Sequence, residues 1–321
     1  MVDNNCIWQE FQSLYSDLKS DEQFPDKKPL LAHYTSIETL ESILKNNELW
    51  FSNPLFMNDV EELRFGINEG ANRFFNSKDI KDSLNEAQFK ILQTQFEQFL
   101  NKFTNEYVLD VYTFCLSEHD EINHPDGLLS MWRGYGSNGN GAALVFDTSK
   151  LESVPSSALV IARVEYSSRQ ERVDWLDRKL KEFSQLLMKL KLGDEQLYLA
   201  SYAIFERIKL FSIFTKHHGF AEEREWRVAF LKDRDMDSKF SPMLGYSIGA
   251  RGVEPKLKLK LEEVAGHISN SVSLSNLVHQ IILGPSVSTP LAKAAFERML
   301  DKIDKPELKS RVWASSIPFR H

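Results

Sequence analysis

The stretch LLAHYTSIETLESILKNNELWFS, residues 30–52, decides the fold class of this chain. Its first five residues form an apolar run that predicts a short buried strand. Thr35 and Glu38, three positions apart, predict a capping box at the start of a helix whose apolar residues recur on one face. The run 48–52 predicts a second strand. The chain therefore opens as strand, helix, strand.

Outward from this unit, helical and extended patterns follow each other irregularly. Apolar residues at helical spacing predict two long helical segments, at about 58–106 and 169–216. The remaining patterned runs predict strands at 108–117, 141–147, 158–166, 226–231, 279–283 and 312–317, and a helix at 291–301. We expect an α+β fold in one domain, residues 1–321. Its mixed, mostly antiparallel, split sheet would be surrounded by helices, with the two helical segments as insertions.

The composition limits the classes of partner. A net charge of -7 and a pI near 5.7 disfavour duplex DNA, which is held through many basic contacts to phosphates. A single-stranded or structured nucleic acid could still use a local patch at Lys256, Lys258 and Lys260, which would share one face of a strand. A solvated edge that prevents aggregation would explain these lysines equally well.

The cysteine count and the amino terminus predict a cytoplasmic protein. Cys6 and Cys115 are too few for a disulfide framework and lack metal-ligand spacing, which fits a reducing compartment. The first residues carry no basic, apolar leader, and no run approaches the roughly 20 apolar residues that cross a bilayer. We therefore expect no membrane partner.

The first candidate site residues are His33, Tyr34 and Thr35, where a strand ends and a helix begins. Backbone N–H groups at such a junction are free to face a ligand. A structural histidine is the alternative.

A second group follows the strand at 48–52. Ser52 and Asn58 would offer hydrogen bonds to a ligand, and Asp59 and Glu62 would offer carboxylates to a hydroxyl or a cation. Asn58 or Asp59 could instead be a helix N-cap.

A third group lies between two predicted strands, from Ser117 to Gly141. The glycines of GYGSNGNG match no phosphate-binding fingerprint and need only permit a tight turn. Trp132 and Tyr135 predict a stacking platform for an aromatic ring.

The fourth group is AEEREWR, residues 221–227, at the entry of a strand. Glu223, Glu225 and Arg227 alternate and are therefore expected on one face. A solvent-facing ladder of charges is the alternative. Because Trp226 and the apolar residues after it would be buried, we expect Glu225 at the edge of a pocket.

These motifs, in this order, resemble a bacterial family of unknown function. The matching segments are HYTS (33–36), LWFSNP (49–54), MNDVEE (57–62), CLSE (115–118), MWRGYG (131–136) with GAALVF (141–146), EREWR (223–227) and IILGP (281–285). The resemblance spans about residues 30–290.

The early histidine and the late Glu-x-Glu strand also resemble the ADP-ribosyltransferase superfamily, more loosely. This second resemblance implies a split mixed sheet that holds NAD. It implies that His33 bonds a ribose hydroxyl, that Tyr34 or Tyr135 stacks on nicotinamide, and that Glu225 is the late glutamate. Ser117 competes with Tyr135 for the middle position.

The resemblance fits the chemistry of the residue types. Departure of nicotinamide leaves an oxocarbenium-like ribose, which a carboxylate such as Glu225 stabilises. Glu223 would orient or deprotonate the acceptor, a protein or nucleic acid. The assignment of these roles among Glu222, Glu223 and Glu225 stays open.

Two alternatives belong to other classes of protein. One is a metal-dependent hydrolase or nuclease that uses carboxylates and a histidine, namely Asp59, Glu62, Glu223, Glu225 and His33. The sequence has no compact metal motif. The other is a binding module in which the same polar and aromatic residues only shape a pocket.

Overall fold

The computed structural model describes residues 3–17, 28–57, 60–152, 154, 157–249 and 252–319. These residues form two compact units, each built from separate parts of the chain. The helical unit contains the described residues within 1–19, 53–111 and 164–220, and the sheet unit contains those within 20–52, 112–163 and 221–321. Both segments expected as helical insertions belong to the helical unit.

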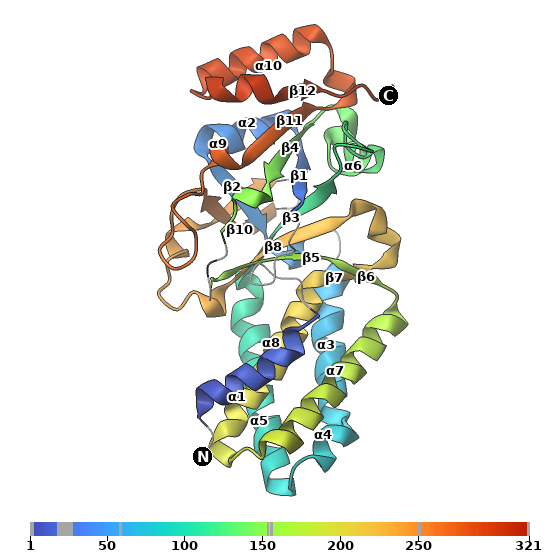
Figure 1. Ribbon diagram of the computed structural model, residues 1–321, viewed down its shortest axis with the longest axis vertical. Helices are drawn as coiled ribbons and strands as arrows, with labels where there is room; N and C mark the ends of the chain where they lie inside the picture. Colours follow the sequence, from blue (N-terminus) through green and yellow to red (C-terminus); the bar gives the residue numbers. More distant parts are fainter. Residues whose placement is uncertain are drawn as a thin grey trace. The chain divides into compact units, whose positions relative to one another are not determined.

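The helical unit is arranged around one buried helix (Figure 1). Its α-helices are α1 (Asn4–Phe11), α3 (Val60–Asn76), α4 (Lys78–Asp82), α5 (Glu86–Lys102), α7 (Arg169–Leu190) and α8 (Leu197–Phe214). Helix α8 contacts α1, α3, α5 and α7, which explains why it is apolar on nearly every side. Two short strands, β6 (Glu165–Ser167) and β7 (Thr215–His217), pair in parallel beside the helices.

Glycines let α3 approach α8 closely. A Cβ at Gly66 would lie 2.2 Å from Ser212 Oγ, and a Cβ at Gly70 would lie 2.5 Å from Ile208 Cγ2. Both distances are far below a van der Waals contact. The position of α3 against α8 therefore requires residues without a side chain.

The sheet unit contains a mixed, mostly antiparallel sheet, as the sequence predicts. Its ten strands are β1 (Leu30–Thr35), β2 (Glu48–Ser52), β3 (Val111–His119), β4 (Ala142–Asp147), β5 (Leu159–Arg163), β8 (Glu225–Leu231), β9 (Leu244–Gly249), β10 (Gly252–Lys260), β11 (Val278–Leu283) and β12 (Val312–Ala314). The main order is β12-β11-β4-β1-β3-β2-β10-β9. Strand β3 also pairs with β8, which pairs with β5, so the sheet branches at β3. Among the pairs of this ten-stranded sheet whose register is described, only β11 and β12 run parallel.

The two faces of the sheet bury different cores. The large core includes Leu31, Phe114 and Leu144 and is covered by residues of α2 (Ile37–Asn46), α9 (Leu274–Leu277) and α10 (Pro290–Lys302). The small core includes Ala32 and Tyr34 and is covered by α6 (Leu129–Gly134), as Figure 1 shows. Successive strand residues point to opposite faces, which assigns each residue of β1 to one core or the other.

Several local predictions were wrong in detail. The N-cap of α2 is Ser36, whose hydroxyl accepts from Thr39 N, so Thr35 still belongs to β1. The strand expected at 158–166 divides into β5 and β6, which pair with different partners, β8 and β7. The run of Lys256, Lys258 and Lys260 is a strand, β10, which pairs with β2 and with β9, for which no strand was expected. Partner strands, rather than local pattern, decide these boundaries.

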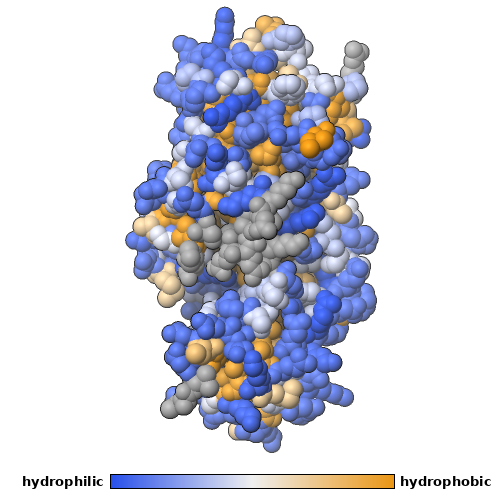
Figure 2. All heavy atoms as spheres, viewed as in Figure 1, coloured by the Kyte–Doolittle hydropathy of each residue, from blue (hydrophilic) through white to orange (hydrophobic). Residues whose placement is uncertain are grey.

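No helix in the described part of the chain is both long and apolar enough to span a membrane. On the face drawn in Figure 2, hydrophilic residues predominate and apolar residues gather only in small patches. Exposed apolar side chains, such as Ile122 and Leu291, occur on several elements, as is normal for a folded protein.

Gly127 should be essential for the packing of the small core. Its φ is +77°, and an added Cβ would lie 2.3 Å from the Tyr34 hydroxyl oxygen. We expect Gly127→Ala to lower the free energy of unfolding by about 1–3 kcal/mol. Chemical denaturation would measure this loss.

Gly134 provides the matched control, because nothing lies within 4 Å of a Cβ added there. Gly134→Ala should change the free energy of unfolding by no more than about 0.5 kcal/mol. Equal effects of the two substitutions would contradict the predicted role of Gly127.

Candidate functional site

Tyr135 and Glu223 meet at the centre of a polar cluster in the sheet unit. Tyr135 follows α6 and is 42% exposed, and its hydroxyl donates to Glu223 Oε1 over 2.8 Å. Ser117, Glu225 and Arg227 complete what we call the Tyr135–Glu223 cluster. The structure therefore brings together residues of the third and fourth sequence groups.

Two hydrogen bonds fix the turn that carries Glu223. Ser117 Oγ donates to the Glu223 carbonyl over 2.7 Å, and Glu118 N donates to the Arg224 carbonyl over 3.0 Å. Arg224 has a φ of +45°, in the left-handed region, so the backbone changes direction before β8 begins at Glu225. The predicted alternation from Glu223 to Arg227 on one strand face was wrong, because Glu223 precedes the strand.

Glu225 and Arg227 do share a strand face, and both are buried. Arg227 Nε donates to Glu225 Oε1 over 2.7 Å, and Nη2 donates to Oε2 over 3.1 Å. Trp226, between them, belongs to the large core, so the pair points away from that core. This two-bond contact balances a buried carboxylate with a buried guanidinium.

The pKa of Tyr135 lies well above its usual value. Burial is the main cause, followed by the hydrogen bond to Glu223 and by the negative charges of Glu223 and Glu225. The phenol therefore stays protonated at neutral pH and acts as a hydrogen-bond donor to Glu223.

Cys115 is a further member of this environment that the sequence reasoning overlooked. It is two residues before Ser117 on β3 and interacts electrostatically with Tyr135. Alternation along the predicted strand was the available signal, since residues two apart share a face.

His33 lies on the other face of the sheet. It pairs with Leu144 of the large core, and its ring packs 4.4 Å, centroid to centroid, from that of Phe114. Ala32, next to it, pairs with Ser117 on the small-core face. The structure thus does not bring His33 to the face that carries Glu225.

The environment of His33 indicates a neutral imidazole. Burial lowers the pKa of His33, and the hydrogen bond with the Cys115 carbonyl opposes this shift. Its Nδ1 lies 3.1 Å from that oxygen, so Nδ1 carries the proton. These contacts fit the structural alternative for this histidine.

Trp132 does not form the expected stacking platform, because it is fully buried. Its Nε1 donates to the Asp126 carbonyl over 2.8 Å, and its ring packs edge-on against Tyr34. Tyr34 is also buried; its hydroxyl accepts from Leu128 N, and burial raises its pKa to about 12. Of the predicted stacking residues, only Tyr135 is exposed enough to receive a ring.

The other predicted binding residues lie apart from the cluster or outside the described residues. Thr35 is buried in β1, and Ser52 Oγ accepts from Lys256 Nζ over 2.8 Å. Asn58 and Asp59 fall outside the described residues, so their predicted roles stay predictions.

Within the described residues, no three His, Cys, Asp or Glu side chains are grouped in a way that could hold a metal ion. The metal-dependent alternative relied partly on Asp59, which lies outside those residues, and on Glu62, whose side chain is not described. The metal-dependent alternative therefore stays a prediction, and removal of metal would test it.

Residues 131–228 match the family model described as "Protein of unknown function (DUF2971)". The match covers less than half of the chain, and it includes Tyr135, Glu223, Glu225 and Arg227 but not His33 or Ser117. The predicted resemblance to a family of unknown function is confirmed for this segment. No curated protein and no solved structure matches the chain.

A second buried histidine, His119 at the end of β3, should make stability depend on pH. Neither ring nitrogen has a hydrogen-bond partner among the described residues. Burial lowers the pKa of His119, Glu121 and Asp120 oppose the shift, and His279 adds to it. In the unfolded chain the pKa returns to about 6.5.

We expect the free energy of unfolding to decrease as the pH falls below about 6.5, because the unfolded chain then binds a proton that folded His119 does not. The slope contributed by one histidine is at most about 1.4 kcal/mol per pH unit. His119→Met should reduce this slope in denaturation measurements between pH 7.5 and 5.5. An unchanged slope in His119→Met would contradict the assignment.

Proposed function

We propose that this protein is an NAD-dependent ADP-ribosyltransferase, or an NAD glycohydrolase when no acceptor is present. The observation that carries the proposal is the contact of the Tyr135 hydroxyl with Glu223, two residues before the buried Glu225–Arg227 pair. An exposed aromatic ring and two carboxylates thus lie in one small region. Cleavage of the bond between nicotinamide and ribose needs these residue types.

Tyr135 would receive the nicotinamide. Aromatic rings stack on tyrosine with a gain of roughly 0.5–1.5 kcal/mol beyond the area that they bury. The hydroxyl bond to Glu223 holds the phenol at its oxygen, so the ring keeps one orientation. Nicotinamide is an aromatic amide, and a fixed ring beside a carboxylate suits its positively charged, NAD-bound form.

The two carboxylates differ in access, which suggests different roles. Both oxygens of Glu225 accept hydrogen bonds from Arg227 in a buried position, whereas Glu223 is half-buried. Glu223 is therefore better placed to touch the ribose or the acceptor. Glu225 would add negative charge behind it, where low-dielectric surroundings strengthen the attraction to the oxocarbenium-like ribose.

Ser117 would act as a positioning residue. Its hydroxyl holds the backbone carbonyl of Glu223, so it sets where that carboxylate lies without touching a substrate. Ser117 and Tyr135 were both candidates for the middle active-site residue of the ADP-ribosyltransferase superfamily. Because Tyr135 is exposed and Ser117 is buried, Tyr135 fits that position better.

The decisive experiment measures nicotinamide release from NAD by the purified chain, with and without cell extract as a source of acceptor. Wild type should release nicotinamide. Glu223→Gln and Glu225→Gln should each lower kcat by about a hundredfold or more, because a neutral amide does not stabilise a developing cation. Tyr135→Phe should mainly raise KM for NAD.

Glu222→Gln is the matched control, since Glu222 is exposed and outside the cluster. It should keep wild-type turnover. Thermal unfolding of every variant would separate loss of chemistry from loss of folding, which matters for the buried Glu225. No release by wild type under any condition, together with no NAD binding by calorimetry, would refute the proposal.

The same assay separates the two alternatives. A metal-dependent hydrolase would lose all activity with a chelator, whereas glycosidic cleavage of NAD needs no metal. A binding module would tolerate Glu225→Gln and would bind its ligand without release of nicotinamide.

A further inference from the structure

The large core of the sheet unit contains a cavity of about 140 Å³ that is partly open to solvent. Strands of the main sheet supply Phe51 and Phe114 to its wall, and β5 and β8 supply Leu159 and Val228. This cavity lies on the face of the sheet opposite to the Tyr135–Glu223 cluster, because Phe51 and Phe114 point into the large core. It is therefore a separate feature of the molecule.

The size and lining of the cavity suit a small apolar molecule. Protein interiors are normally packed as closely as organic crystals and leave few voids larger than a water molecule. An apolar void of roughly 150 Å³ lined by Leu, Ile and Phe stays dry and takes up benzene. The cavity here has nearly that volume, and most of its lining residues are apolar.

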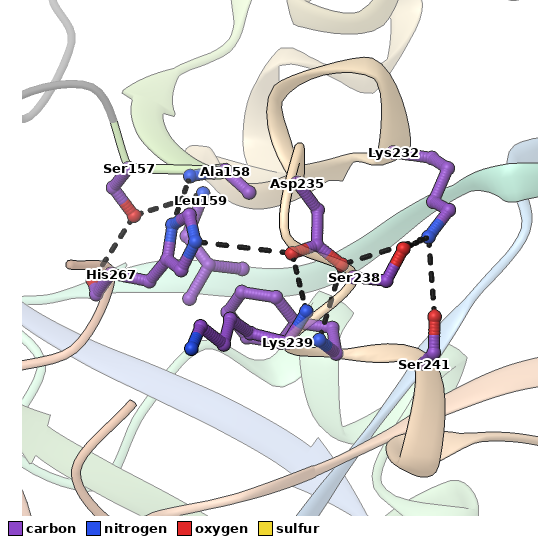
Figure 3. A network of polar contacts seen from close by, with 10 residues as sticks. Ser157, Ala158, Leu159, Lys232, Asp235, Ser238, Lys239, Ser241 and His267 are labelled. Carbon is purple, nitrogen blue, oxygen red and sulfur yellow. Dashed lines mark hydrogen bonds and ion pairs between the residues drawn. The ribbon is translucent and has the colours of Figure 1, made fainter. Parts of the chain in front are cut away.

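Most polar residues in the wall already make hydrogen bonds within the protein. His267 Nδ1 accepts from Ala158 N over 3.0 Å, and its Nε2 lies 3.9 Å from Asp235 Oδ1 (Figure 3). Ser157 Oγ donates to the His267 carbonyl over 3.0 Å. Ser269 Oγ donates to Glu152 Oε2 over 2.6 Å.

Asp235 makes this wall rigid. It is buried, and its carboxylate accepts from Lys239 N over 2.7 Å and from Phe240 N over 3.1 Å (Figure 3). The ring of Phe240 packs against His267 with the centroids 5.1 Å apart. A wall held by its own hydrogen bonds cannot easily collapse to fill the void.

One carboxylate determines which polar group the cavity accepts. Glu152 is in the lining and is exposed, which places it toward solvent. A ligand carboxylate at this end would meet a charge of its own sign, whereas a hydroxyl or an ammonium group would meet an acceptor.

We propose that this cavity binds a compact apolar molecule, about the size of a benzene ring with a short substituent, whose polar end is a neutral or cationic donor. The proposal does not depend on NAD chemistry. The apolar wall provides affinity, and the carboxylate of Glu152 selects against anions.

Three compounds with the same ring and different polar ends test the proposal: benzyl alcohol, benzylamine and benzoate. Thermal unfolding and ligand-observed NMR would be recorded with the full chain. Benzyl alcohol and benzylamine should raise Tm in a concentration-dependent manner, because they bind only the folded state. Benzoate should bind at least about tenfold more weakly.

A cavity-filling variant locates the binding. Val272 is buried in the cavity wall, and Val272→Phe should abolish the ligand-induced shift in Tm. Val253→Phe makes the same substitution at an exposed position of β10 and should leave the shift intact. If Val272→Phe does not fold, methyl NMR of wild type should show shifts at Leu159, Leu261 and Leu277, which line the cavity.

Three results would overturn the proposal. Absence of binding by all three compounds would mean that the void is a packing imperfection. Binding that persists in Val272→Phe, or methyl shifts away from the cavity, would place the ligand elsewhere. Binding of benzoate as tight as that of benzyl alcohol would refute the selection by Glu152.

Discussion

The alternation of side chains along β3 is the constraint on which the rest of the sheet unit depends. Tyr112, Phe114 and Leu116 of this strand enter the large core, so Cys115 and Ser117 must point to the opposite face. Because β3 pairs with β1, β2 and β8, the side chains of these three strands alternate between the same two faces of the sheet. The division keeps His33 with the aromatic core and gathers the polar cluster on the other side. A shift of register by one residue would exchange the two sets.

The buried Glu225–Arg227 pair lies on β8, the strand through which the sheet branches from β3. Taking two charges out of water costs several kcal/mol per ion, and their attraction offsets this only when the geometry is good. The two short bonds between them provide such geometry. A buried ion pair is weak evidence of a role in stability, and perturbed ionisable groups of this kind are more frequent at functional sites than elsewhere.

Sequence reasoning succeeded where local pattern and burial agree. The strand–helix–strand opening, the two helical segments and the mixed, mostly antiparallel sheet follow from apolar periodicity. It was wrong where a partner strand decides: the run expected as one strand at 158–166 divides into β5 and β6, which pair with different strands. Among the candidate site residues that it selected, Tyr135, Glu223, Glu225 and Arg227 lie close together, and their roles stay predictions. It could not place Trp132, because the same residue type serves equally well as an exposed stacking ring or as core.

The sequence by itself determined which residues can carry chemistry and which elements bear them, because residue type and periodicity are local properties. Only the tertiary structure decided which of them meet. The left-handed backbone at Arg224 removes Glu223 from the strand and turns it toward Tyr135, 88 residues away in sequence. The pairing of Ala32 with Ser117 puts the neighbouring His33 on the far face. Contacts of this kind depend on how distant strands align, and no pattern within one segment contains that information.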